Sequence, residues 1–182
     1  MRVAQLQAAD AARYRTLMLQ AYELAADAFT STAAERAAEP ESFWARRIAN
    51  PTGLGAVFGA FEGEELVGTV ALEFSARPKT KHKGHVIGMY VAPQARGTGA
   101  GRALAAAVIA HASAREGLLL LNLTVTEGNA PAGHLYRSVG FQEFGVEPMA
   151  ILTPTGFKAK IHMWLPLQQG FRCSSSARVT DL

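Results

Sequence analysis

A glycine-rich segment between an apolar strand and an alanine-rich helix most constrains how this chain can fold. The run "GMYVA" ends at Pro93, glycines alternate at Gly97, Gly99 and Gly101, and the helix-forming stretch "RALAAAVIAHASA" follows. A helix N-terminus leaves several backbone N–H groups without partners and carries roughly half a positive charge. Glycines just before it let phosphate oxygens reach those amides without meeting a Cβ atom. The segment therefore predicts a strand, a loop and a helix that together bind a phosphate or diphosphate.

The rest of the sequence predicts a mixed sheet covered by helices. Apolar and alternating runs indicate strands at 3–6, 56–61, 66–74, 85–91, 118–125, 142–146 and 160–165. Helical patterns occupy 11–29, 40–50, 101–116 and 131–139. Thr32 and Glu35 have the spacing of a capping box, and Gly63 suits the turn of an antiparallel hairpin. This order of elements predicts an α/β (α+β) fold with helices on both faces of the sheet.

Composition narrows the class of protein. The 182 residues are 49% hydrophobic and 18% charged, which is typical of a folded domain. The N-terminus lacks the apolar core of a secretory signal, and no apolar run is long enough to span a bilayer, so we expect a cytoplasmic protein without a membrane partner. A single cysteine, Cys173, excludes an internal disulfide and a structural Cys/His site, so no metal is expected.

The charge balance favours an anionic ligand. The formal net charge is +3, a mild excess that does not require nucleic acid. The densest basic run, "KTKHKGH" at 79–85, has no interleaved aromatic residues and indicates a solvated loop rather than a nucleic-acid-binding patch. A nucleic-acid binder would instead show strongly salt-dependent affinity that depends on Lys79, Lys81 and Lys83.

Three phosphate-binding patterns compete for the glycine segment. A P-loop would need Lys-Ser or Lys-Thr after its last glycine, and the chain has neither there. A Rossmann fingerprint would need glycine at position 102, which is an arginine here. The pattern Gln/Arg-x-x-Gly-x-Gly/Ala does fit, as "QARGTG" at 94–99. It resembles the acetyl-CoA loop of the GNAT superfamily of N-acetyltransferases.

A second segment carries the same resemblance. "LTVTEGNAPAGHLYRSVGF" is similar to that superfamily's strand, Leu-Tyr helix and Gly-Phe ending, through Asn129, Ala132, Leu135, Tyr136, Gly140 and Phe141. The resemblance follows the element order over 1–167 and is most specific over 86–141. It implies the GNAT fold: a mixed, mostly antiparallel central sheet of six to seven strands, splayed in the middle, with helices on both faces. Residues 168–182 would then form a polar C-terminal tail.

The resemblance also implies acetyl-CoA as co-substrate. The pantetheine arm would pair with the strand around Met89 and Val91, and the diphosphate would bind the loop amides, with arginine charge at either end. Asn129 would contact the arm from the other side, although it also suits a plain helix cap before Pro131. The implied cofactor-binding residues are Met89, Tyr90, Val91, Gln94, Arg96, Gly97, Thr98, Gly99, Ala100, Gly101, Arg102, Asn129 and Tyr136.

Acetyl transfer to an amine needs a base and an acid. An alkylamine of pKa about 10.4 is almost fully protonated at pH 7, so a base or a water relay must deprotonate it. Tyr136 occupies the family's general-acid position; the alternative is a buried helical tyrosine. His85 lies near the place where some relatives carry a glutamate base; the alternative is a solvated residue at a strand start. Glu73 is a further candidate, and Thr124 stands where ribosomal-protein acetyltransferases carry a glutamate.

These resemblances imply an acyltransferase that moves acetyl from acetyl-CoA directly to a primary amine of a small molecule or peptide. The alternative is a catalytically silent GNAT-fold module that binds acyl-CoA as a regulator. Glu147-Pro148 and His162-Met163 look like features of a subgroup with a longer final hairpin, whose members mostly act on small amines. Many relatives dimerise through sheet edges or that hairpin, so the resemblance also allows a homodimer.

Overall fold

The computed structural model describes residues 1–167, and the predicted polar tail with Cys173 lies outside the described residues. Seven strands form one sheet in the order β1-β2-β3-β4-β5-β7-β6. Every neighbouring pair is antiparallel except β4 and β5, which are parallel. The predicted mixed, mostly antiparallel sheet is therefore confirmed. The strands are β1 (Arg2–Gln5), β2 (Gly55–Glu62), β3 (Glu65–Phe74), β4 (Lys83–Val91), β5 (Leu120–Thr126), β6 (Gln142–Thr153) and β7 (Gly156–Pro166).

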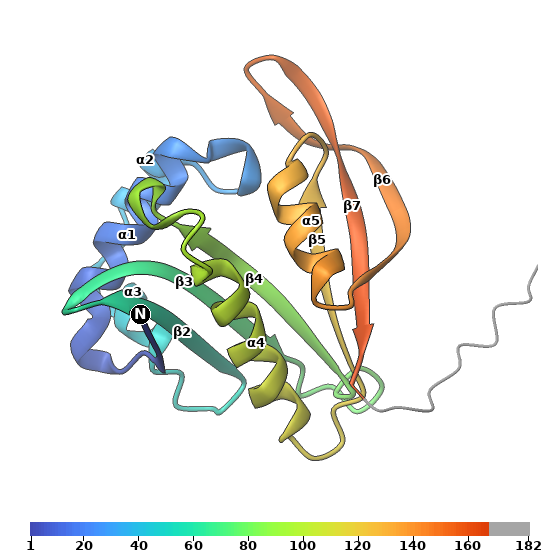
Figure 1. The fold of residues 1–182 in the computed structure, drawn as a ribbon, viewed down its shortest axis with the longest axis horizontal. Coiled ribbons are helices and arrows are strands. Elements are labelled where there is room, and N and C mark those ends of the chain that lie inside the picture. The colour runs from blue at the N-terminus through green and yellow to red at the C-terminus, as the bar shows by residue number, and fades with distance from the viewer. Residues whose placement is uncertain (168–182) are drawn as a thin grey trace, which may run out of the picture.

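Helices cover both faces of the sheet. The helices α4 and α5 lie on one face, and α1, α2 and α3 lie on the other (Figure 1). The predicted capping box is present, because the Thr32 N–H donates to Oε2 of Glu35 at 2.7 Å and the Glu35 N–H donates to Oγ1 of Thr32 at 3.2 Å. The helices are α1 (Ala11–Leu24), α2 (Ala33–Ala37), α3 (Glu41–Ile48), α4 (Ala100–Ser113) and α5 (Ala130–Ser138), with 3-10 turns at Ala8–Asp10, Ala26–Ala28 and Pro93–Ala95.

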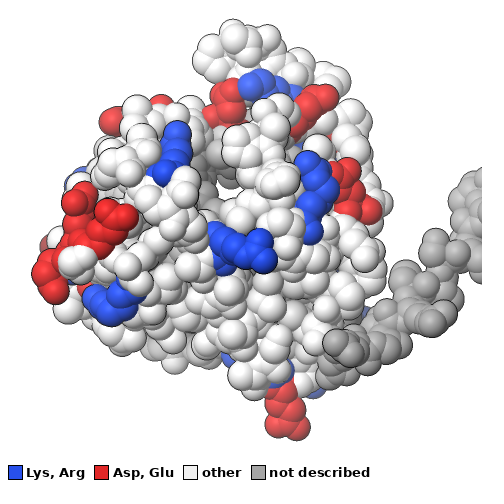
Figure 2. Space-filling view, in the orientation of Figure 1, with Lys and Arg blue, Asp and Glu red and all other residues white. Residues whose placement is uncertain are grey.

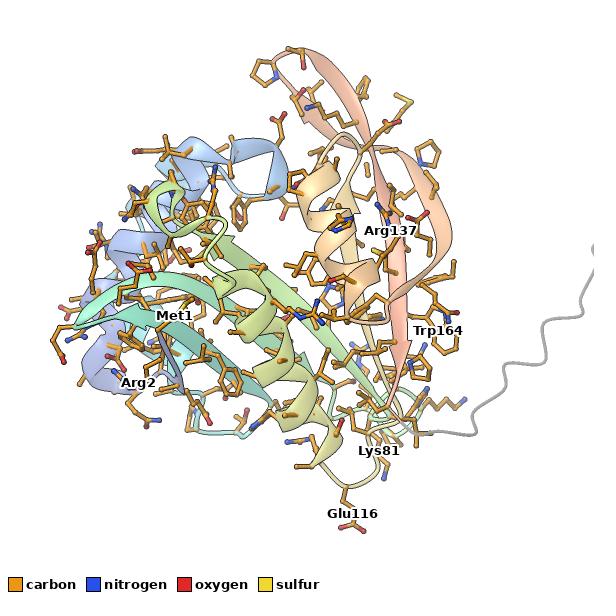
Figure 3. All side chains as sticks on the ribbon, in the orientation of Figure 1. Met1, Arg2, Lys81, Glu116, Arg137 and Trp164 are labelled. Atoms are coloured by element: carbon orange, nitrogen blue, oxygen red, sulfur yellow. The ribbon has the colours of Figure 1, made fainter. Side chains whose placement is uncertain are left out.

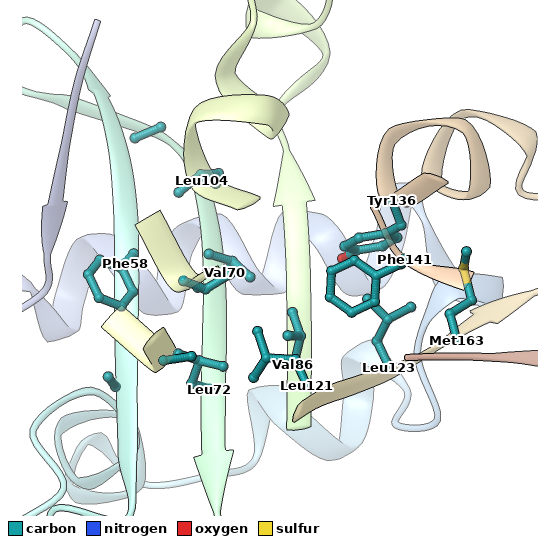
Figure 4. Packing of buried hydrophobic residues seen from close by; sticks show 14 of the residues in the cluster. Phe58, Val70, Leu72, Val86, Leu104, Leu121, Leu123, Tyr136, Phe141 and Met163 are labelled. Carbon is teal, nitrogen blue, oxygen red and sulfur yellow. The ribbon is translucent and has the colours of Figure 1, made fainter. Parts of the chain in front are cut away.

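Two apolar layers hold the helices on the sheet. On the first face the layer contains β3 and α4 side chains that are at most 1% exposed, among them Val70, Leu72, Leu104 and Val108 (Figure 4). On the second face α1 and α3 bury Tyr14, Met18 and Trp44 to the same extent. Full burial of one such side chain contributes about 1.5–3 kcal/mol. The two layers therefore fix β3 and β4 rigidly beneath the loop that begins α4.

The parallel strands β4 and β5 pair only at one end. Lys83–His85 of β4 lie against Leu120–Asn122 of β5, and no further pair forms between them. Beyond these residues the two strands diverge, while β4 stays paired with β3 and β5 stays paired with β7 (Figure 1). The edge of β4 that faces β5 is therefore free from Val86 to Val91. We call this opening the fork, and it confirms the predicted splay of the sheet.

A β-bulge interrupts β4 inside the fork. The register of β4 on β3 shifts between Thr69 and Ala71, which leaves Gly88 and Met89 together opposite Val70. Gly88 has a φ of 63°, in the left-handed region that favours glycine. A bulge bends the strand and re-aims its backbone groups. The backbone of β4 is therefore turned at the middle of its free edge.

The C-terminal hairpin corrects the prediction most clearly. In place of short strands at 142–146 and 160–165, β6 and β7 form one long hairpin that spans 142–166. The register shifts after Glu147, where Pro148 offers no N–H and Met149 has a φ of 52°. Because of these two residues, the sequence does not show the alternation of apolar and polar residues that is typical of a paired strand. The helices predicted to reach residues 29 and 116 also end earlier, at Leu24 and Ser113.

Candidate active site

The loop before α4 presents open backbone at the end of β4. Gly97 (φ 79°) and Gly99 (φ 90°) take left-handed conformations, and Gly99 is the N-cap of α4. A methyl group at either glycine would meet no atom within 4 Å, so the protein leaves the space in front of them open. The first helical bond runs from the Ala103 N–H to the Gly99 carbonyl at 3.0 Å, so the earlier amides have no helical acceptor. This geometry suits an anion.

Hydrogen bonds from three side chains stabilise the conformation of the loop. Oγ1 of Thr98 donates to the Ala95 carbonyl at 2.7 Å, and Nε of Arg96 donates to the Val91 carbonyl at 3.1 Å. Nε2 of Gln94 donates to a carboxylate at the start of β3 at 3.3 Å. These predicted binding residues are therefore engaged within the protein, and the loop offers a ligand its backbone amides.

The remaining predicted loop and strand residues have different surroundings. Ala100 is 1% exposed, so only its amide can face a ligand. A methyl group at Gly101 would lie 3.1 Å from Cδ2 of Leu135, which shows that α4 and α5 approach closely there. The Tyr90 side chain packs in the layer under α1, away from α4. Arg102 is exposed in the first turn of α4.

The free edge of β4 offers backbone groups to the fork. The Ala92 N–H donates to the Val67 carbonyl of β3 at 2.8 Å. Because neighbouring residues of a strand direct their backbone groups to opposite sides, the N–H and C=O of Val91 point away from β3 and into the fork. Met89 lies in the bulge two residues earlier. An extended ligand can therefore add to β4 as a further strand.

The helix α5 brings Tyr136 to the fork from the β5 side. Its ring packs edge-on against Phe141 with centroids 5.5 Å apart, and its hydroxyl is directed toward the strand that carries Val86 (Figure 4). Burial raises the pKa of Tyr136 far above its ordinary value, so the hydroxyl keeps its proton at neutral pH. Oδ1 of Asn129 accepts from the Ala132 N–H at 3.2 Å, so Asn129 caps α5, which is one of the two roles that the sequence predicted for it.

His85 and Glu73 lie on the face of the sheet opposite Tyr136. They are directly opposite each other in the pairing of β3 with β4, and their neighbours Leu72 and Val86 face α4. Nδ1 of His85 lies 2.7 Å from Oδ1 of Asn122, at the last β4–β5 pair. With the amide oxygen as acceptor, Nδ1 is the donor, so in the neutral ring Nε2 is the nitrogen that keeps its lone pair. The structure therefore brings His85 and Glu73 together and places Tyr136 across the sheet.

A cavity of 230 Å³ lies beside the fork on this second face. Its walls come from β4, β5, β7 and the chain around α2, and they include Gly88 of the bulge and Thr124. Of the described residues, no Asp or Glu lines it, and the charged or titratable ones are Tyr22, Arg36, Arg47, His85 and Lys160. We call this space the basic cavity. It opens onto the bulge, where the free edge of β4 turns.

Several residues at this site were not identified from the sequence. Arg47 is three residues after the buried Trp44, and this helical spacing on α3 was a signal that could have identified it as inward-facing. Arg36, Asn122 and Lys160 carry no comparable signal. Arg36 and Lys160 line the same cavity, and Asn122 contacts His85, only because α2, β5 and β7 come together with β4 in the folded chain.

Other charged groups lie outside the basic cavity. Basic side chains flank the N-terminal turn of α4 and lie on α5, on the face seen in Figure 2. Lys81 lies at the closed end of the fork, at the opposite end of β4 from the glycine loop (Figure 3). Within residues 1–167, no group of three or more His, Cys, Asp or Glu side chains is placed to hold a metal ion. Over the same residues, no helix has the length and apolar character to cross a membrane.

The model of the acetyltransferase (GNAT) family matches residues 18–141, which include both motif segments and the fork. The chain belongs to the GNAT family. Its mycothiol acetyltransferase relative from Thermobispora bispora is 46% identical over 66 residues, which are 36% of this chain. The match spans only 22% of the length of that relative.

Two solved acetyltransferase structures are similar in fold to this chain over most of its length. A phosphinothricin acetyltransferase from Sinorhizobium meliloti, in complex with acetyl-CoA, has a TM-score of 0.80 and 20% identity, covering 93% of this chain and 90% of its own. A Salmonella typhimurium protein solved with its cofactor acetyl-CoA has a TM-score of 0.77 and 19% identity, covering 96% of this chain and 98% of its own. At these identities the likeness shows the GNAT fold alone, and it confirms the predicted fold class.

Proposed function

We propose that this GNAT protein transfers an acetyl group from acetyl-CoA to a primary amine of a small molecule or peptide. One observation carries the proposal: the fork between β4 and β5 leads from the glycine loop, with its unpaired amides, to the basic cavity beside His85. The loop recognises a diphosphate, and the free strand edge recognises an amide-containing arm. Acetyl-CoA combines both features, and the Sinorhizobium meliloti and Salmonella typhimurium neighbours contain it.

Acetyl-CoA binding uses mainly the backbone of the chain. The diphosphate accepts hydrogen bonds from the amides of residues 97–102, where the helix dipole adds a favourable potential. The pantetheine arm pairs with the edge of β4 at Met89 and Val91. Arg96 then leaves the Val91 carbonyl, to which it donates at 3.1 Å, and its guanidinium is free to contact the phosphates. The thioester lies in the fork next to the bulge at Gly88.

The reaction is a direct acyl transfer. The amine nitrogen attacks the thioester carbonyl carbon, so that a C–N bond forms and the C–S bond breaks. A backbone N–H of the bulge in β4 donates to the developing oxyanion. Tyr136 donates its proton to the departing sulfur, because burial keeps the hydroxyl protonated at neutral pH and the ring reaches the fork from α5. The products are the acetylated amine and CoA.

We assign the base to His85. Its Nδ1 is 2.7 Å from Oδ1 of Asn122, which fixes the ring and leaves Nε2 as the proton acceptor. His85 lines the basic cavity, so an amine bound there can deliver its proton to this nitrogen. Glu73 is exposed and lies in the neighbouring hollow beside Arg47, where its charge acts on the arginine. Asn122 is therefore a positioning residue for the base.

The release of CoA thiol from acetyl-CoA, with a panel of primary amines, tests this proposal. Acetyl transfer predicts thiol release that depends on both the amine and Tyr136. Binding of acetyl-CoA without thiol release for any amine would contradict it and would favour the regulatory module. The cytoplasmic location and the homodimer stay predictions.

A further inference from the structure

We propose that the acceptor amine carries a carboxylate, which binds between Arg36 and Arg47 in the basic cavity. The inference rests on the proposed acetyl transfer and names the class of acceptor. It starts from the concentration of positive charge there, since Arg36, Arg47 and Lys160 all line the same 230 Å³. A cationic acceptor such as a polyamine would be repelled by this lining.

Both guanidinium groups contact an aromatic ring and a hydroxyl group. Cζ of Arg36 lies 5.1 Å from the centre of the Phe43 ring, and Cζ of Arg47 lies 6.0 Å from the same centre. Nη2 of Arg36 donates to Oγ of Ser31 at 2.8 Å, and Nε of Arg47 donates to the Tyr14 hydroxyl at 3.3 Å. One aromatic ring therefore orders two cations, and the ordering does not need a protein carboxylate between them.

The positive charge is only partly neutralised by the described residues. Glu39 lies 3.6 Å from Nη1 of Arg36, but Arg47 and Lys160 form no ion pair within 4.0 Å in residues 1–167. Nε of Arg36 is buried and has no hydrogen-bond partner there. Glu73 attracts Arg47 without forming an ion pair with it, so the charge of the cavity lining stays positive. A carboxylate suits this lining, because its two oxygens accept from the accessible guanidinium N–H groups and supply the opposite charge.

The size of the basic cavity and its two ends define the acceptor further. A volume of 230 Å³ suits a molecule of amino-acid size rather than a folded protein segment. The arginines lie on the α2 and α3 side, whereas His85 and Gly88 form the wall along β4. An amino acid can therefore place its carboxylate at the arginines and its amine beside the base and the thioester.

Matched pairs of acceptors test the proposal on the intact chain. Thiol release from acetyl-CoA is measured with L-amino acids and with the corresponding amino-acid amides. The amides keep the amine and lose the negative charge, and because their amines are less basic, a larger fraction is unprotonated and able to attack at neutral pH. We nevertheless expect kcat/KM for the acids to exceed that for the amides by at least about tenfold.

Two arginine variants and one control complete the test. Arg47→Gln should lower kcat/KM for the acids by about tenfold or more and change that for the amides less than about twofold. Arg36→Gln should show the same pattern, and Arg46→Gln, on the exposed side of α3, should leave both unchanged. The Kd for acetyl-CoA of each variant reports whether it is folded.

The outcomes separate the two proposals. Equal use of acids and amides, or an equal loss for both in the arginine variants with acetyl-CoA affinity intact, overturns the carboxylate site and leaves acetyl transfer standing. Absence of thiol release with every amine overturns acetyl transfer, and the carboxylate site with it.

Discussion

In the proposed function, the two sides of the fork recognise their ligands in different ways. On the cofactor side, the groups that face a ligand are backbone amides of consecutive residues between Arg96 and Arg102. On the acceptor side they are side chains from elements far apart in the sequence, such as Arg36, Arg47 and Lys160. A backbone site is encoded by glycine spacing within one segment, whereas a side-chain site depends on tertiary packing. The cofactor side can therefore be common to a family while the acceptor side varies.

The largest expected effect concerns Tyr136, which belongs to the cofactor side but acts only in the reaction. Tyr136→Phe should lower kcat by about 10²-fold or more, because the leaving sulfur loses its proton donor. The Kd for acetyl-CoA should change little, since the phenyl ring still packs on Phe141. Steady-state kinetics and calorimetric titration measure the two quantities. An unchanged kcat would remove the general-acid role.

A smaller effect is expected for the base, on the acceptor side. His85→Ala should lower kcat/KM by about ten- to a hundredfold, because the amine loses its proton acceptor. Asn122→Ala should lower it less, because the ring stays but loses the partner at 2.7 Å that orients it. Steady-state kinetics of the three proteins, with kcat and KM reported separately, measure this. If His85→Ala keeps the full kcat, the proton goes to another group.

The glycine loop gives the next effect. At Gly99, with its φ of 90°, an alanine is strained and its methyl group enters the open space in front of the amides, so Gly99→Ala should weaken acetyl-CoA binding about tenfold. Gly63→Ala is the matched control: its φ is 57°, the space around it is also open, and it lies in the β2–β3 turn. Equal acetyl-CoA affinities for the two variants would show that the amides of this loop do not bind the diphosphate.

The contrast between the two sides also explains what the sequence could predict. The strand, loop and helix around Gly97 and Gly99 were predicted correctly, because glycine and proline restrict or free the backbone only at and next to their own positions. The fork followed from the resemblance and is confirmed by pairing that stops at His85. The basic cavity was missed, since Arg36 is in a five-residue helix without a clear pattern. The strand pattern made the final hairpin too short because Pro148 breaks its alternation, whereas the resemblance through Glu147-Pro148 and His162-Met163 had indicated a longer one.

The smallest expected effect is on stability. Burial raises the pKa of Tyr136 above that of an exposed tyrosine, which ionises near pH 10. Above that pH the unfolded chain loses a proton that the folded chain keeps, so folding stability falls as pH rises. This contribution is full below pH 10 and decreases by about 1.4 kcal/mol per pH unit above it. Denaturant melts between pH 9 and 11 should show a shallower decline for Tyr136→Phe. Parallel declines would mean that the hydroxyl is hydrated in the folded protein.

Hydrogen exchange of individual backbone amides, with and without saturating acetyl-CoA, tests most directly whether the backbone of one loop and one strand edge binds the cofactor. The account predicts slower exchange at residues 97–102 and at Val91, and no change in the pairing of β1 with β2 at the far edge of the sheet. Unchanged exchange of the loop amides in the saturated complex would contradict it.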